Sequence, residues 1–181
     1  MATSLQDIPL RTIDGAETTL AAFAGKVALI VNVASKCGLT PQYEGLEALY
    51  RAYRERGLVV LGFPANNFLA QEPGTEAEIA DFCKTTYDVT FPMFAKLSVA
   101  GEDRHPLYAA LVAAQPEAYS PNGQAMRERL ASKNIPIYPA PNVLWNFEKF
   151  LIGRDGAVLG RFAPDTPPAD PALTEAIERA L

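Results

Sequence analysis

The chain is poor in the residues that build metal sites and hydrolytic triads. Its 181 residues include two cysteines, Cys37 and Cys83, and a single histidine, His105. These three side chains cannot supply the four ligands of an ordinary Cys/His zinc site. Any serine-histidine-aspartate triad would depend on the one histidine. Neither a glycine-rich phosphate loop nor a dinucleotide-binding fingerprint occurs in the sequence, so we expect no bound metal or cofactor.

An excess of positive charge and long apolar runs are also lacking. Lysine plus arginine number 16 against 21 acidic residues, a net charge of −5. Because nucleic-acid binding relies on clustered positive charge, this balance argues against a nucleic-acid partner. The first residues lack the basic start and apolar run of a secretory signal, and no stretch approaches the roughly 18 apolar residues that span a bilayer. We therefore expect a cytoplasmic protein with no membrane span, in which both thiols stay reduced.

Length and composition are typical of one globular domain. Hydrophobic residues make up 49% and charged residues 20% of the chain. Since about 150 residues is a usual domain size, we expect residues 1–181 to form a single domain. Residues 115–142 carry five prolines and predict a surface excursion with a short helix at about residues 124–131. This excursion is a candidate element for self-association into a homo-oligomer.

The hydrophobic pattern predicts a strand–helix–strand unit in the first third of the chain. Residues 27–33 (VALIVNV) are apolar except for Asn32, which is typical of a buried central strand. Thr40 and Pro41 predict the N-cap and first residue of the following helix. Residues 58–63 (LVVLGF) predict a second buried strand. Two buried strands joined by a helix are normally parallel.

The rest of the chain predicts helices and then a β-hairpin. A capping box at Thr75 and Glu78 predicts a helix over the residues that follow. Residues 147–152 and 157–162 flank an Asp-Gly turn, a strong hairpin signal. A last helix is predicted to begin at Asp170. This order of elements predicts an α/β fold in which a mixed central sheet has helices on both faces.

Cys37 is the strongest candidate for chemistry. It lies between the end of the first buried strand and the start of the next helix, with Lys36 beside it. Unpaired backbone N–H groups, the positive end of the helix dipole and a neighbouring cation all favour a thiolate. The spacing resembles a Cys-x-x-Cys redox motif whose second position is Thr40, so no local disulfide can close. The alternative is a buried, inert cysteine.

Three segments resemble the signature blocks of the glutathione peroxidase family: NVASKCGLTPQYEGLEALY, GFPANNFLAQEPGTEAEIADFC and WNFEKFLIGRDG. The resemblance extends over nearly the whole chain, from about Leu5 to the C-terminal helix. It implies a thioredoxin-like fold and the reduction of hydrogen peroxide and organic hydroperoxides. It also places the peroxidatic residue at Cys37 and the partners that activate it at Gln71, Trp145 and Asn146.

The types of these three partners suit the chemistry. Amide and indole N–H groups are neutral donors that can stabilise a thiolate and a departing oxygen without a tight ion pair. Each residue also has a structural alternative. Gln71 could be a loop residue, Trp145 a core aromatic residue and Asn146 a turn residue.

Cys83 bears on the identity of the reductant. It lies on the apolar face of its predicted helix, so a small core residue is the alternative. In the cysteine-type branch of the family, which takes electrons from thioredoxin, a resolving cysteine occupies this motif position. Many relatives have a further cysteine where this chain has Ala65. Relatives that use glutathione hold its carboxylates with several arginines, for which only Arg161 and Arg51 are candidate matches in this chain.

The predicted function is a thiol peroxidase. Peroxide oxidises Cys37 to a sulfenic acid, Cys83 resolves it as a disulfide, and thioredoxin reduces that disulfide. Two alternatives use the same Cys37: a peroxidase driven by glutathione, and a non-enzymatic redox sensor or relay. His105, at the start of a further helix, is expected to be structural.

Overall fold

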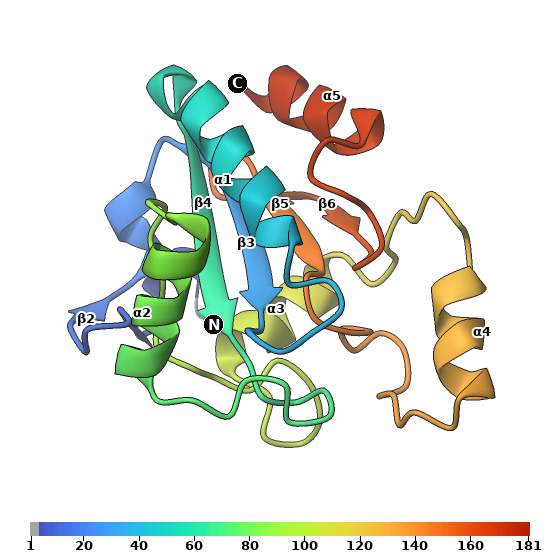
Figure 1. Cartoon of the computed structure of the whole chain (residues 1–181). Helices are drawn as coiled ribbons and strands as arrows, with labels where there is room; N and C mark the ends of the chain where they lie inside the picture. The colour runs from blue at the N-terminus through green and yellow to red at the C-terminus, as the bar shows by residue number, and fades with distance from the viewer. Residues whose placement is uncertain (1–3) are drawn as a thin grey trace.

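A four-stranded sheet of order β4-β3-β5-β6 forms the centre of the computed structural model, which describes residues 4–181 (Figure 1). Its strands are β3 (Val27–Val33), β4 (Leu58–Pro64), β5 (Lys149–Ile152) and β6 (Val158–Phe162). β3 and β4 pair in parallel, whereas β5 runs antiparallel to both of its neighbours. The predicted mixed sheet, with its parallel first pair and its C-terminal hairpin, is therefore confirmed.

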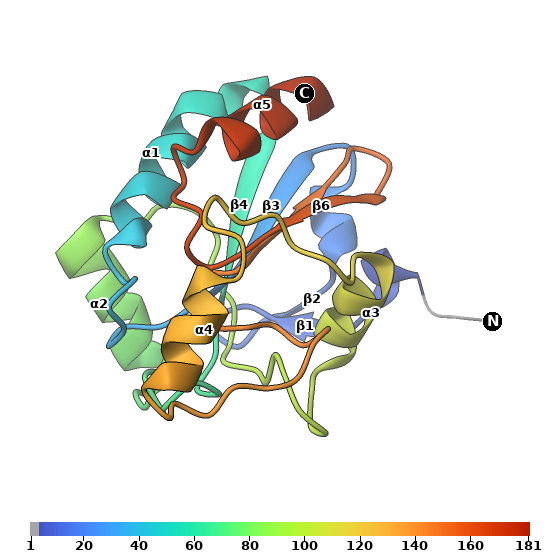
Figure 2. The ribbon, with the colours of Figure 1, turned by 90° about the vertical axis from the view of Figure 1, so that its right-hand side faces the viewer.

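Helices cover both faces of this sheet, as predicted (Figure 2). α1 (Gln42–Tyr53), α2 (Glu76–Tyr87) and α5 (Pro171–Ala180) pack on one face, and α3 (Pro106–Ala114) packs on the other. Every residue of β3 is buried, because its alternate side chains enter the apolar cores on the two faces. The strand that leads to Cys37 is thus held from both sides.

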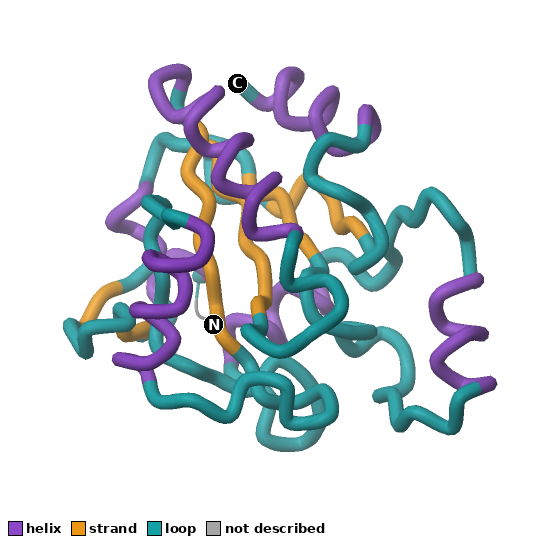
Figure 3. Tube along the Cα trace, in the orientation of Figure 1, coloured by secondary structure: helices purple, strands orange, loops and turns teal. Residues whose placement is uncertain are grey.

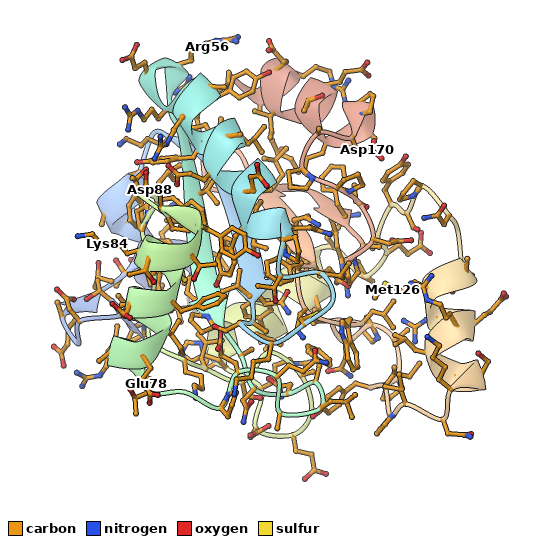
Figure 4. All side chains as sticks on the ribbon, in the orientation of Figure 1. Arg56, Glu78, Lys84, Asp88, Met126 and Asp170 are labelled. Carbon is orange, nitrogen blue, oxygen red and sulfur yellow. The ribbon has the colours of Figure 1, made fainter. Side chains whose placement is uncertain are left out.

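Local sequence signals determine where three of the helices begin. Thr75 and Glu78 form the predicted capping box of α2. Asp170 and His105 cap α5 and α3 in a similar way, since each side chain accepts a hydrogen bond from the backbone N–H two residues later. Glu78 and Asp170 mark the first turn of α2 and the start of α5 in Figure 4. The structural role predicted for His105 is confirmed.

The start of α1 differs from the prediction. The sequence predicts Thr40 as the N-cap, but α1 begins at Gln42 and the Thr40 hydroxyl does not cap it. This hydroxyl accepts a hydrogen bond from the N–H of Cys37 (3.0 Å) and donates one to the carbonyl of Ala34 (2.8 Å). Both bonds join Thr40 to residues that precede it in the chain. Thr40 therefore stabilises the loop between β3 and α1 (residues 34–41, the cysteine loop) and not the start of the helix.

Residues 115–142 follow α3 and consist of α4 (Ala125–Ser132) with a loop on either side of it (Figure 3). The helix therefore lies close to the one predicted at about residues 124–131. The guanidinium of Arg161 joins the two ends of this segment. It donates to two carbonyls at the start of the segment and to the carbonyl of Asn142 at its end, each at 3.1 Å. The same guanidinium pairs with the buried carboxylate of Glu148 at 2.5 Å. Breaking such a buried pair leaves an uncompensated charge, at a cost of about 3–5 kcal/mol.

Several short elements have no counterpart in the prediction. They are two strands, β1 (Leu10–Arg11) and β2 (Glu17–Thr18), and three 3₁₀ helices, η1 (Leu5–Asp7), η2 (Leu20–Phe23) and η3 (Arg54–Arg56). Strands of two residues are too short to show an alternating hydrophobic pattern. Within residues 4–181, no helix has both the length and the apolar character needed to cross a membrane.

Lys149 on β5 is a buried cation near the start of α1. Its ammonium group donates to Oε1 of Gln42 (2.7 Å) and to the carbonyl of Thr166 (2.6 Å), which ties β5 to the start of α1 and to the segment before α5. Burial lowers the pKa of Lys149 to about 7, although three nearby carboxylates act in the opposite direction.

This lowered pKa predicts that the contribution of Lys149 to stability rises with pH. Between pH values of about 7 and 10.5, the unfolded chain binds a proton at Lys149 that the folded chain does not, so the Lys149 contribution to the free energy of unfolding increases with pH across this range. The variant Lys149→Met should lack this contribution. Denaturant unfolding of both proteins at several pH values measures it, and parallel profiles for the two proteins would contradict the prediction.

Candidate active site

Cys37 lies half-buried in the loop between β3 and α1, and its thiol is free. The sulfur accepts a hydrogen bond from the backbone N–H of Leu39 at 3.3 Å. The N–H of Cys37 itself is bound by the Thr40 hydroxyl, which keeps the loop in this turn. A backbone N–H directed at sulfur favours the thiolate, because it stabilises negative charge there. One of the backbone donors that the sequence predicts is therefore present.

Gln71 and Asn146 lie together next to this loop. Nδ2 of Asn146 donates to Oε1 of Gln71 at 2.8 Å, although the two residues are 75 positions apart. The backbone carbonyl of Gln71 accepts a hydrogen bond from the N–H of Lys36 at 3.0 Å. Since Lys36 precedes Cys37, these bonds connect the cysteine loop, the Gln71 loop and the segment before β5.

Trp145 packs into the apolar cluster that also contacts Cys37. Its ring centroid lies 5.1 Å from that of Phe68, and only 5% of the residue is exposed. Trp145 is therefore a core aromatic residue, and its cluster is one of the two that contact Cys37. A core position does not conflict with the partner role that the resemblance implies for this residue.

The backbone on both sides of this site is strained. Leu69 (φ 51°) and Ala70 (φ 49°) precede Gln71 in the left-handed region, and Phe147 (φ 68°) follows Asn146 there. A left-handed conformation costs a non-glycine residue roughly 1–2 kcal/mol. Such strain concentrates at functional sites, where the surrounding packing holds it. Here it belongs to the two turns that present the Gln71 and Asn146 amides.

Cys83 occupies the third turn of α2 and is only 2% exposed. It belongs to the second apolar cluster, which also contacts Cys37. Burial raises the pKa of the Cys83 thiol to about 11, and the hydroxyl of Tyr43 acts in the opposite direction. Both cysteines are free thiols on separate elements, one in a loop and the other inside a helix.

A cavity of about 270 Å³ separates the cysteine loop from α2. Lys36 lines it on the loop side, and Ile79 and Phe82, close neighbours of Cys83, line it on the helix side. The buried carboxylate of Glu72 faces the same cavity, and burial raises its pKa despite its contacts with Ser35. The two thiol-bearing elements are therefore not packed tightly against each other at this point.

The two arginines that match glutathione-binding positions are engaged elsewhere. Arg161 has a side chain only 4% exposed and is bound to Glu148 and to backbone carbonyls. Arg51 pairs with Glu47 at 2.5 Å and with Asp88 at 3.0 Å. Both guanidinium groups already have carboxylate partners from this chain.

Sequence reasoning missed the polar residues that hold the loops of the site. Glu148 accepts a hydrogen bond from the N–H of Leu144 at 3.1 Å and closes the turn that carries Trp145 and Asn146. Asn32 donates from Nδ2 to the carbonyl of Trp145 at 3.1 Å. The available signal was the position of Asn32, a lone amide within an apolar strand.

A free thiol in the loop after the first central strand of a thioredoxin-like sheet defines this chain as a thiol protein of the thioredoxin-like class. The thiol:disulfide interchange protein of Chlorobium tepidum TLS has the same fold, with a TM-score of 0.61 and 15% identity over 99% of this chain and 98% of that one. The crystal structure of Trgpx in its apo form is more similar in sequence. Its TM-score is 0.69, with 38% identity over 98% of this chain and 97% of that chain.

Sequence comparison defines the family. The family model described as glutathione peroxidase matches residues 5–112. The chain is 56% identical to the thioredoxin/glutathione peroxidase BtuE of Escherichia coli (strain K12), over 100% of this chain and 99% of that protein. It is 49% identical to the hydroperoxy fatty acid reductase Gpx2 of Synechocystis sp. (strain ATCC 27184 / PCC 6803 / Kazusa), over 95% and 96% of the two chains. The chain belongs to the glutathione peroxidase family, and it is a thiol peroxidase.

The different surroundings of the two thiols predict different rates of alkylation. At neutral pH, iodoacetamide should modify Cys37 in the folded protein and leave Cys83 largely unmodified, because Cys83 is buried with a pKa of about 11. Labelling of Cys83 should increase about tenfold per pH unit below that pKa, since only the thiolate reacts. Peptide mass spectrometry measures both sites, with the urea-unfolded chain as control. Equal labelling of the two folded sites at neutral pH would rule the prediction out.

Proposed function

We propose that Cys37 is the peroxidatic residue and that it reacts as a thiolate. The observation that carries this proposal is the N–H of Leu39 directed at the Cys37 sulfur, in a loop tied through Lys36 to Gln71. The thiolate attacks one peroxide oxygen and the O–O bond breaks. A sulfenic acid forms on Cys37, and the second oxygen takes a proton and leaves as water or alcohol.

In this proposal Gln71, Trp145 and Asn146 supply neutral hydrogen bonds to the sulfur and to the departing oxygen. The bond from Asn146 to Oε1 of Gln71 supports this role, because it occupies the accepting end of the glutamine amide. Nε2 of Gln71 is left as the donor. Electrostatic stabilisation of this kind is strongest when the donors are held in place before the reaction begins.

We propose Cys83 as the resolving residue. Its thiol condenses with the Cys37 sulfenic acid, a disulfide forms and water leaves. A disulfide requires Cα atoms within roughly 7 Å, and Cys83 is buried in α2, so this helix opens locally before the bond forms. The cavity between α2 and the Lys36 segment supports this step, because it offers space beside the helix into which side chains such as Phe82 can move.

Thioredoxin is the proposed reductant. Its dithiol exchanges with the Cys37–Cys83 disulfide, returns both cysteines to thiols and becomes oxidised itself. Arg161 and Arg51 support this choice, since both are paired within the chain and neither offers an unpaired cation to the carboxylates of glutathione. The BtuE relative carries both reductants in its name, so glutathione remains the second candidate.

Hydrogen peroxide and organic hydroperoxides are the proposed substrates, acted on in the cytoplasm, where the thiols stay reduced. Two relatives, at 49% and 47% identity, are hydroperoxy fatty acid reductases by name. Leu69, 52% exposed and two residues before Gln71, offers an apolar surface for an acyl chain. We further propose that residues 1–181 form one domain and that the segment 115–142 is the surface for self-association.

The variant Cys37→Ser should lose peroxide reduction, because serine cannot form a sulfenic acid. Turnover is measured by NADPH consumption in the presence of thioredoxin and thioredoxin reductase, with hydrogen peroxide and cumene hydroperoxide as substrates. Circular dichroism checks that the variant is folded. Turnover close to that of the parent would show that Cys37 is not the nucleophile.

The variant Cys83→Ser should separate the two half-reactions. Its first oxidation by peroxide should proceed at the parental rate, since Cys37 and its donors are unchanged, while turnover with thioredoxin should stop. Stopped-flow fluorescence of Trp145 follows the oxidation. Parallel assays compare thioredoxin with glutathione at matched thiol concentrations. If the variant turns over with thioredoxin as fast as the parent, Cys83 has no resolving role. If the parent protein turns over faster with glutathione than with thioredoxin, glutathione is the reductant.

A further inference from the structure

Asn32 is the one polar residue of β3, and it has no exposed surface. A buried amide costs free energy unless hydrogen bonds replace its contacts with water. Its Nδ2 donates to the carbonyl of Trp145 at 3.1 Å, whereas its Oδ1 has no partner among residues 4–181. Within the described part of the chain, the hydrogen bond to the Trp145 carbonyl is therefore the one interaction that the Asn32 side chain makes and that an apolar side chain at this position could not make.

The backbone of Asn32 holds the same segment a second time. Its carbonyl accepts a hydrogen bond from the N–H of Phe147 at 2.6 Å. Asn32 thus binds the peptide group on each side of Asn146. These bonds continue the β3–β5 pairing beyond its last pair, Val31 opposite Lys149, into the turn where Phe147 has a φ of 68°.

The position of Asn32 links the thiol to its neighbours. Cys37 follows in the loop after the same strand, so one short segment carries the sulfur and also binds the turn of Trp145 and Asn146. Asn146 in turn holds Gln71. A shift of this turn relative to β3 would therefore move all three proposed donors relative to the sulfur.

We propose that Asn32 is a positioning residue for peroxide reduction, holding the Trp145–Phe147 turn so that the side chains of Trp145 and Asn146 face Cys37. This inference rests on the proposed roles of Trp145 and Asn146. Glu148 closes the same turn from its other side through the N–H of Leu144, so the turn keeps one support when the Asn32 amide is removed.

The test is the variant Asn32→Val, which places a β-branched, apolar side chain at this buried position of the strand and removes the amide. The rate constant for Cys37 oxidation by hydrogen peroxide should fall about tenfold to a hundredfold, because misplaced donors stabilise the transition state less well. Trp145 is the only tryptophan of the chain. Its near-ultraviolet circular dichroism should weaken and its fluorescence quenching by acrylamide should increase.

The matched control is Val31→Ala, a cavity-forming change at the neighbouring position of β3, which has no side-chain bond to the turn. It should lower the stability of the fold but leave the oxidation rate and the Trp145 signals close to those of the parent. Should Asn32→Val fail to fold, Asn32→Ser is measured in the same way, since its short hydroxyl cannot replace the bond to Trp145. A folded Asn32 variant with the oxidation rate and Trp145 signals of the parent overturns the inference.

Two further variants separate this inference from the proposed function. If Trp145→Phe and Asn146→Ala both react with peroxide at the parental rate, the catalytic assignment fails, and the positioning inference fails with it. If both are slow while Asn32→Val is not, only the positioning inference fails. Slow oxidation in all three, with parental rates in Val31→Ala, supports both.

Discussion

The pairing of β3 with β5 brings together two parts of the chain that are more than a hundred residues apart, and the site depends on it. Asn32 and Trp145, which are 113 positions apart, are joined at the end of this pairing. Cys37 follows the first strand and the amide of Asn146 precedes the second. The buried apolar faces of both strands fix the register, because a slip of one residue would turn their side chains to the opposite faces. Core packing therefore sets the geometry around the thiol.

The charged residues close to the site serve the structure. Lys149 joins β5 to α1, while Glu148 and Arg161 close the Trp145 turn and join the ends of the segment 115–142. All three are buried and hydrogen-bonded, and the groups that we propose around the thiol are neutral: two amides, an indole and the backbone N–H of Leu39. This division suits a nucleophilic sulfur, since a tight ion pair would stabilise the thiolate but reduce its reactivity.

Much of the fold could be predicted from the sequence because strong local signals coincide with the elements. The apolar run of β3, the capping box of α2 and the Asp-Gly hairpin each have a single simple interpretation. The role of Thr40 could not be read in the same way, because its hydroxyl has two sets of backbone groups within reach and binds those of the cysteine loop. Similarly, the bonds of Asn32 and Arg161 join distant segments, which local patterns do not reveal.

The site residues were recognisable as motifs, but their arrangement depends on tertiary contacts. The central claim is that Cys37 and Cys83 form one redox pair although one lies in a loop and the other inside a helix. Treatment of the full chain with one equivalent of hydrogen peroxide, followed by intact-mass measurement and disulfide mapping, tests it most directly. The account predicts single chains, not joined to each other by disulfides, that have lost two hydrogens and carry a Cys37–Cys83 bond. Accumulation of a sulfenic acid at Cys37 with Cys83 still a free thiol would contradict it.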